Sequence, residues 1–200
     1  MKPETTSQIE LSRSQAVINR YGNLENALAR LSPISIQKAI YAYSIKSNRQ
    51  AYLTDSITLA TFTKAYSKDS CIALIELWLF ELNDFVGVNG KMNSSQINQL
   101  AQLIYSEAYS LNFAEFGLFF KRVKMGLYGE FFGVVDPMKI MTFLEQFLVE
   151  RSKSIEEYNK ELDQDKKRLD FQDCLNMKLT NEQQSEISEI HKNFIKTMKR

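Results

Sequence analysis

Apolar side chains recur at helical spacing along most of the chain, and residues typical of helix ends separate the stretches. The most apolar stretch is residues 70–85, with Asp69 in a position to cap its first turn. Its apolar positions lie on nearly all sides of a helix, which is typical of a helix buried on most of its surface. We therefore expect this helix, with Trp78 in its middle, to form the centre of the core.

The same spacing predicts helices before and after this one. Ser47 to Gln50 is polar and is interpreted as a connector, and a break near Thr54-Asp55 is compatible with the pattern of residues 52–66. The other expected helices span residues 9–21, 24–31, a third that begins at Ser32-Pro33 or at Ser35, 52–66, 94–109, 113–124, 137–169 and 182–199.

Residues 113–151 contain four of the seven glycines and a dense series of Phe and Tyr. The helix predicted at 113–124 should end at Gly126, because Gly commonly follows a helix C-terminus. Residues 127–135 are too rich in glycine for a stable helix, so we interpret them as a tight aromatic loop, with a short hairpin as the alternative. Asp136-Pro137 then begins another helix.

The pattern as a whole predicts an all-α fold with three parts. Residues 1–50 would be a basic helical arm or subdomain, residues 51–151 the helical core domain, and residues 152–200 a helical C-terminal extension. A helix over residues 137–169 would be ~50 Å long. Its second half has a narrow apolar stripe between charged flanks, which is compatible with a coiled coil or with a hairpin against the last helix.

Composition limits the possible classes of protein. The 200 residues are 44% hydrophobic and carry a formal net charge of +1, so the whole molecule offers no strong field for nucleic acid or membrane. Residues 1–50 are modestly basic, with seven basic and three acidic side chains. Cys71 and Cys174 fit free thiols in a reducing cytoplasm. The N-terminus has no apolar core of a signal peptide, and no run is long enough to span a membrane.

The sequence offers little support for catalysis. The single histidine, His191, lies in a polar segment, and the paired carboxylates lie on a charged helix where solvation explains them. The glycines of residues 126–133 lack the Gly-Lys-Ser/Thr ending of a phosphate-binding loop and the spacing of a dinucleotide fingerprint. We therefore predict no enzyme, no cofactor and no metal site.

A nucleic-acid site is the sharper hypothesis for the glycine-aromatic stretch. Cations that meet phosphates beside rings that stack on bases are what single-strand binding requires. The alternative is that the rings are core and that the cations stabilise the end of a helix. The candidate residues are Lys121, Arg122, Lys124, Tyr128, Phe131 and Phe132.

The string F-F-K-R-V-K-M-G-L-Y-G-E-F-F-G-V-V-D-P-M-K-I-M, followed by a helix ending in Glu-Arg, resembles an uncharacterised family of gut Bacteroidota and their phages and mobile elements. The segments 91–97 and 101–109 also resemble it, so that the resemblance covers about residues 60–151. The family has no established activity and implies no catalytic residue. Its setting implies DNA replication or maintenance of a mobile element.

These patterns lead to a prediction of function with an alternative. We expect a non-catalytic accessory protein for replication or maintenance of a phage or mobile element, similar to a helicase loader, that binds a replication protein or single-stranded DNA. The alternative is a structural or assembly protein held by its C-terminal helices. A protein partner is expected, single-stranded nucleic acid and self-association through the C-terminal helices are further options, and no membrane is expected.

Overall fold

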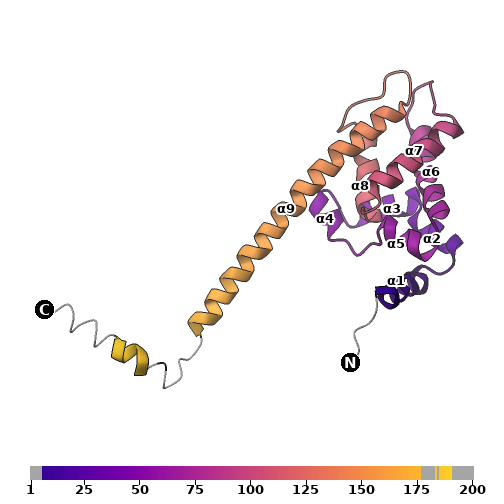
Figure 1. Ribbon diagram of the computed structural model, residues 1–200. Coiled ribbons are helices and arrows are strands. Elements are labelled where there is room, and N and C mark those ends of the chain that lie inside the picture. The colour runs from indigo at the N-terminus through magenta and orange to yellow at the C-terminus, as the bar shows by residue number, and fades with distance from the viewer. Residues whose placement is uncertain (1–5, 177–182, 184, 191–200) are drawn as a thin grey trace. The chain divides into compact units, whose positions relative to one another are not determined.

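The computed structural model describes residues 6–176, 183 and 185–190, and these residues confirm the all-α prediction (Figure 1). No strand occurs within them. The chain divides into two compact units, residues 1–156 and residues 157–200. The helices are α1 Thr6–Tyr21, α2 Leu24–Leu31, α3 Pro33–Ala42, α4 Asn48–Tyr52, α5 Leu59–Ala65, α6 Lys68–Phe85, α7 Ser94–Ala108, α8 Phe113–Lys124 and α9 Pro137–Asn176.

Side-chain caps fix where most of these helices begin. Each cap oxygen accepts a hydrogen bond from the backbone N–H three residues later, which satisfies a donor that has no partner inside the helix. The capping residues of α2 to α8 are Asn23, Ser32, Ser47, Thr58, Ser67, Asn93 and Asn112. The caps of α4, α7 and α8 are reciprocal, since a Gln or Glu side chain bonds back to the cap.

Two details of the helix predictions are wrong, and one alternative is settled. Residues 47–50 are not a connector, because Ser47 and Gln50 form the capping box that starts α4. The break allowed near Thr54-Asp55 is present, since α4 ends at Tyr52 and α5 begins only at Leu59. Ser67, two residues earlier than expected, takes the capping role assigned to Asp69. In the two wrong predictions, a hydrogen bond to a short polar side chain fixes the start of the helix. The spacing of apolar residues does not show such a bond.

The core is organised around α6, as the sequence predicts. Trp78 is fully buried, and its indole nitrogen donates a 3.2 Å hydrogen bond to the carbonyl oxygen of Leu31 in α2. Its ring lies 5.5 Å from that of Phe116 and 5.1 Å from that of Phe120, centroid to centroid. Trp78 therefore joins α2, α6 and α8, and its one polar group is satisfied.

Helix α8 is buried along most of its length. It packs against α3, α4 and α6, and Phe113, Phe116, Phe119 and Phe120 are all fully buried. Gly117 allows α3 to come close: a Cβ at this position would lie 2.5 Å from Cγ2 of Ile36. The absence of a side chain at Gly117 therefore sets the distance between these helices.

Residues 126–135 form the aromatic loop and not the alternative hairpin. Gly126, Gly129 and Gly133 have φ angles of 71°, 125° and 73°, in the left-handed region where other residues are strained. The loop is held by Gly90, whose N–H donates to the Gly133 carbonyl and whose carbonyl accepts from Val135. These backbone angles explain why the chain turns here and does not continue as helix or strand.

Helix α9 begins as predicted, with the Asp136 carboxylate accepting a 2.9 Å hydrogen bond from the Met138 N–H. In the first unit, Ile140, Phe143, Leu144 and Phe147 of α9 are buried. In the second unit, the side chains of residues 159–170 are all exposed. Residues 183 and 185–190 are helical, whereas His191 and the rest of the predicted last helix lie outside the described residues. No helix in the described part of the chain has the length and hydrophobicity needed to cross a membrane.

Candidate functional site

The structure gives Lys121 two neighbours from outside its own helix. Its ammonium nitrogen lies 4.8 Å from the ring centroid of Tyr41 and donates a 3.4 Å hydrogen bond to the carbonyl oxygen of Ile45. Tyr41 is in α3, and Ile45 is in the turn between α3 and α4. Lys121 therefore connects the C-terminal end of α8 to that turn.

Arg122 and Tyr128 share a carboxylate of α9. The Arg122 guanidinium donates to Glu150 at 2.8 Å and to the Tyr128 hydroxyl at 3.2 Å, and the hydroxyl lies 3.3 Å from the same Glu150 oxygen. Burial raises the pKa of Tyr128, and the hydrogen bond from Arg122 opposes that shift. Only 15% of the Arg122 side chain is exposed, so this cation is largely used inside the fold.

Lys124 is also engaged inside the protein. Its ammonium forms an ion pair with Glu81 of α6 and lies 5.0 Å from the ring centroid of Phe85. The two aromatic residues of the loop differ from one another. Phe131 packs edge-on against Phe143 at 5.7 Å, whereas Phe132 is 77% exposed with the Lys139 ammonium 5.1 Å from its ring.

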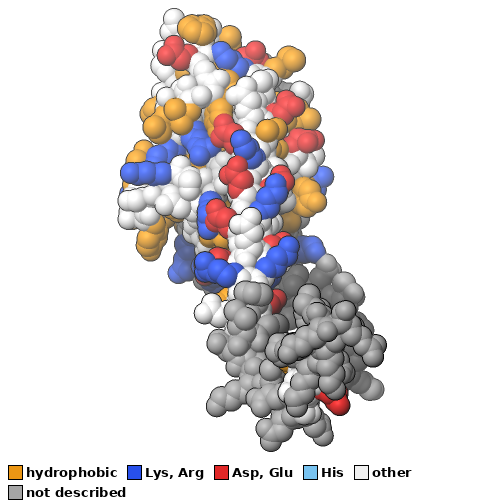
Figure 2. All heavy atoms as spheres, turned by 90° about the vertical axis from the view of Figure 1, so that its left-hand side faces the viewer, with side chains coloured by type: hydrophobic (Ala, Val, Ile, Leu, Met, Phe, Trp, Pro, Cys, Tyr) orange, Lys and Arg blue, Asp and Glu red, His pale blue; other side chains and the backbone are white. Residues whose placement is uncertain are grey.

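The six predicted residues therefore do not form one surface. Lys121 faces α3, Arg122 and Tyr128 face α9, Lys124 faces α6, and only Phe132 projects from the loop. Nucleic-acid binding by this set stays a prediction. On the face shown in Figure 2, Lys and Arg side chains are interspersed with Asp and Glu, so that face presents no large area of one charge.

An open groove of about 830 Å³ lies between α7 and α9 in the first unit. Leu103 on the α7 side is 53% exposed, and Met138 on the α9 side is 79% exposed. Leu100 and Leu144 are buried beneath them. The residues that line the groove are Gln96, Gln99, Leu100, Leu103, Glu107, Asp136, Pro137, Met138, Met141, Thr142, Leu144, Glu145 and Leu148.

All the charged side chains that line this groove are acidic. Glu107, Asp136 and Glu145 line it, and its lining contains no Lys or Arg. Three carboxylates repel phosphate, so the groove is unsuited to nucleic acid. An apolar groove with an acidic rim instead suits an apolar segment with basic flanks.

The amino-acid pattern does not predict this groove. Its residues belong to two helices that were predicted correctly, but the pattern cannot show that Leu103 and Met138 stay uncovered. One signal was available: the apolar residues of 137–148 are spread over more than one helix face, with Met138 and Met141 beside the core positions. Methionine, unbranched and adaptable, is common at surfaces that accept varied partners.

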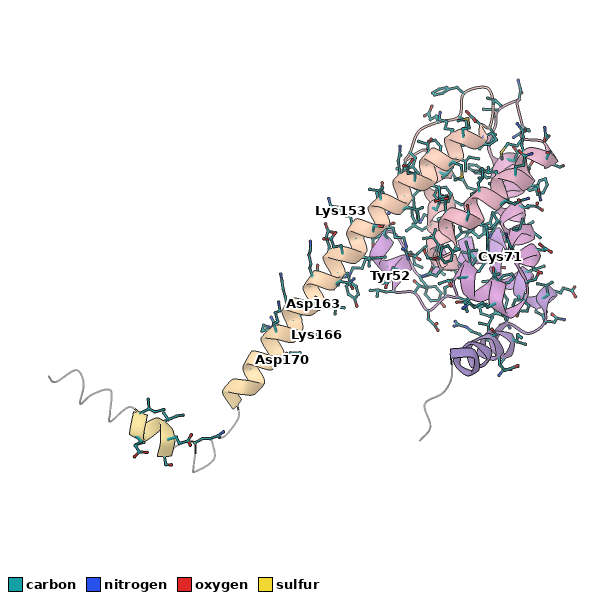
Figure 3. The ribbon with its side chains drawn as sticks, viewed as in Figure 1. Tyr52, Cys71, Lys153, Asp163, Lys166 and Asp170 are labelled. Carbon is teal, nitrogen blue, oxygen red and sulfur yellow. The ribbon has the colours of Figure 1, made fainter. Side chains whose placement is uncertain are left out.

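A buried ion pair holds the start of α8 to α9. Arg151 donates to the Glu115 carboxylate at 2.6 Å, and only 1% of the Glu115 side chain is exposed. Glu115 also accepts the Asn112 N–H, and Tyr52, which lies beside α9 in Figure 3, has its ring 5.6 Å from the Arg151 guanidinium. With both charges partnered, this pair is structural. No cluster of His, Cys, Asp or Glu among the described residues could hold a metal ion.

The fold and groove define a helical protein with an exposed groove that is apolar at its base and acidic at its rim. A family of unknown function, DUF6633, matches residues 91–192, and the chain belongs to this family. The match includes α7, α8 and the groove between α7 and α9. The prediction of an uncharacterised family is thereby confirmed. No curated protein and no solved structure matches the chain.

Proposed function

We propose that this protein is a non-catalytic adaptor for DNA replication or maintenance of a phage or mobile element, and that it binds a replication protein through the α7–α9 groove. The groove carries the proposal. Two helices with an uncovered apolar channel between them accept a third helix in the way that helix-in-groove complexes do. The acidic rim favours a partner helix with Lys or Arg beside its apolar face.

The replication setting has a separate basis. It comes from the resemblance to a family of gut Bacteroidota, their phages and mobile elements, and not from the geometry of the groove. A helicase-loader-like adaptor is the form that unites both lines, since such an adaptor would act by holding another protein.

The test places a positive charge in the groove. Leu103→Arg puts a cation where the occupant should carry one, while Leu77→Arg changes a residue of similar exposure in α6 and serves as the matched control. Arg is a good helix former, so both variants should fold. Tagged full-length proteins would be used to recover partners from the host, with quantitative mass spectrometry as the measurement.

We expect a helicase or another replication protein to be recovered with the parent and with Leu77→Arg, and to be reduced at least tenfold with Leu103→Arg. Recovery of the same protein with all three would remove the groove from the proposal. Recovery of no replication protein with the parent would remove the replication role.

A second candidate function is structural assembly through the second unit. Leu162 and Leu169 are exposed at 38% and 61% and are seven residues apart, which is the repeat of a coiled-coil seam. Light scattering of the full chain at several concentrations tests it. A mass that rises with concentration, and that Leu162→Glu with Leu169→Glu returns to the monomer value, favours assembly; a monomer at every concentration contradicts it.

A further inference from the structure

The segment from residue 26 to residue 54 contains no Asp or Glu, although it carries Arg30, Lys38, Lys46 and Arg49. It includes α3, α4 and the turn between them. The chain as a whole has almost equal numbers of both charges, 25 basic and 24 acidic. This run therefore contributes positive charge and no negative charge of its own to the surface that it forms.

The same segment exposes tyrosine rings. Tyr41 is 65% exposed and Tyr43 is 78% exposed, whereas the four Phe rings of α8 are fully buried. Lys38 lies one helical turn before Tyr41 on the same side of α3, and the Lys121 ammonium lies 4.8 Å from the Tyr41 ring. Tyr41 is thus a largely exposed ring with the Lys121 ammonium beside it and Lys38 on the same side of α3.

The turn that carries Tyr43 is held in place by hydrogen bonds. The Lys121 ammonium donates to the Ile45 carbonyl and the Arg122 guanidinium to the Lys46 carbonyl, each at 3.4 Å. The Gln50 side chain accepts the N–H groups of Lys46 and Ser47 at 2.9 and 3.1 Å. A fixed turn presents its rings without a further ordering cost on binding.

A cavity of about 690 Å³ continues this surface. Tyr43, Arg20 and Arg30 line it, and Asp55 is the one carboxylate in its lining. Asp55 is paired with Arg20 at 2.9 Å, so it adds no uncompensated negative charge. The surface around Tyr41 and Tyr43 therefore combines open rings, a net positive charge and a neighbouring hollow.

We propose that this α3–α4 corner, made of Lys38, Tyr41, Tyr43, Lys46 and Lys121, binds single-stranded nucleic acid. Bases stack on the two tyrosine rings, and the lysine side chains meet the phosphates between them. Double-stranded DNA hides its bases and would use only the cations. This surface differs from the α7–α9 groove and does not depend on a protein partner at that groove.

The test measures fluorescence anisotropy of a labelled oligothymidylate of about 20 nucleotides against the full chain at several salt concentrations. Stacking on a ring is worth about tenfold in affinity or more, so Tyr41→Ala with Tyr43→Ala should weaken binding by about 100-fold. Tyr41→Phe should bind as the parent does, because it keeps the ring. Lys38→Gln with Lys46→Gln should lower the slope of log affinity against log salt by about 1.4.

The matched controls lie on other faces. Tyr109→Ala removes a ring that is 55% exposed after α7, and Lys153→Gln removes an exposed cation of α9. Both should leave affinity unchanged, as should Leu103→Arg in the groove. Circular dichroism checks that each variant is folded.

Three results overturn the proposal. The parent fails to bind oligothymidylate at low salt, or the double tyrosine variant binds as tightly as the parent. The third result is that the parent binds vesicles of phosphatidylserine and does not bind oligothymidylate. That result would mean that the corner binds an anionic membrane surface.

Discussion

Helix α8 and the α3–α4 corner contain the same kinds of residue, aromatic rings beside cations, and the fold uses them in opposite ways. In α8 the Phe rings are fully buried, and the side chains of Arg122 and Lys124 are 15% and 10% exposed and paired with carboxylates. At the corner, Tyr41 and Tyr43 are largely open and the Lys38 side chain faces solvent.

The difference follows from what surrounds each helix. Helix α8 packs on α3, α4 and α6, so every cation at its end meets another element and needs a partner there. Tyr41 and Tyr43 lie where α3 ends and the chain turns, and most of each side chain remains exposed. Composition alone is thus a poor guide to binding. The exposure of an aromatic ring indicates a binding surface better than the presence of a cation next to it in the sequence does.

The largest expected effect separates the two regions by stability. Phe120→Ala empties a fully buried site against Trp78 and Phe116 and should lower the free energy of unfolding by about 3–5 kcal/mol. Tyr41→Ala should change it by less than about 0.5 kcal/mol, because the ring is open. Urea unfolding followed by circular dichroism measures both. Equal losses of unfolding free energy in the two variants would contradict the difference between the buried α8 and the exposed corner.

Breaking the ion pair at the start of α8 should cost about 3 kcal/mol. Arg151→Met leaves the buried Glu115 carboxylate without its cation. Adding Glu115→Gln should restore part of the loss, because the amide keeps the cap without a buried charge. Lys153→Met, on the exposed side of the same helix, is the control and should have little effect. A double variant no more stable than Arg151→Met would show that burial of the charge is not the cause.

Cys71, in the core near the start of α6 (Figure 3), makes the buried region sensitive to alkali. Burial raises its pKa from 9.0 to about 11, so the unfolded chain releases the thiol proton first. The folded state should then lose about 2–3 kcal/mol as the pH rises from 9 to 11. Urea midpoints across that range, compared with those of Cys71→Ala, isolate this contribution. If the stability of Cys71→Ala falls with rising pH as steeply as that of the parent, other groups cause the loss. Tyr21, Tyr66 and Tyr128 are among these groups, because burial also raises their pKa values.

Gly117→Ala should have the smallest effect, about 1 kcal/mol of destabilisation. The new methyl would lie 2.6 Å from Cδ1 of Ile40, which can rotate away, and 2.5 Å from Cγ2 of Ile36, which is bonded to Cβ, so that α3 must shift slightly. Thermal unfolding measures the change. Because α3 is displaced, Tyr41 should also shift, so weaker binding of oligothymidylate by this variant would connect the two regions. A gain in stability would contradict the close approach of α3 and α8.

The sequence predicted the elements well and the surfaces poorly. Helical spacing and caps placed α2, α7 and α8, and the apolar character of α6 identified Trp78 as the centre. The start of α4 was missed because Ser47 and Gln50 act through hydrogen bonds that polarity alone does not reveal. The uncovered groove and the open tyrosines depend on which neighbours are absent, and the spacing of residues along one chain does not contain that information.

Trp78 provides the most direct test, because it is the chain's single tryptophan and it touches the aromatic rings of α8. Its fluorescence in the native protein should be shifted to the blue, and acrylamide should quench it far less than in urea, with no change when oligothymidylate or a partner is added. Native emission quenched as strongly as in urea would contradict the account, since α8 and its rings would then not be the interior of the protein.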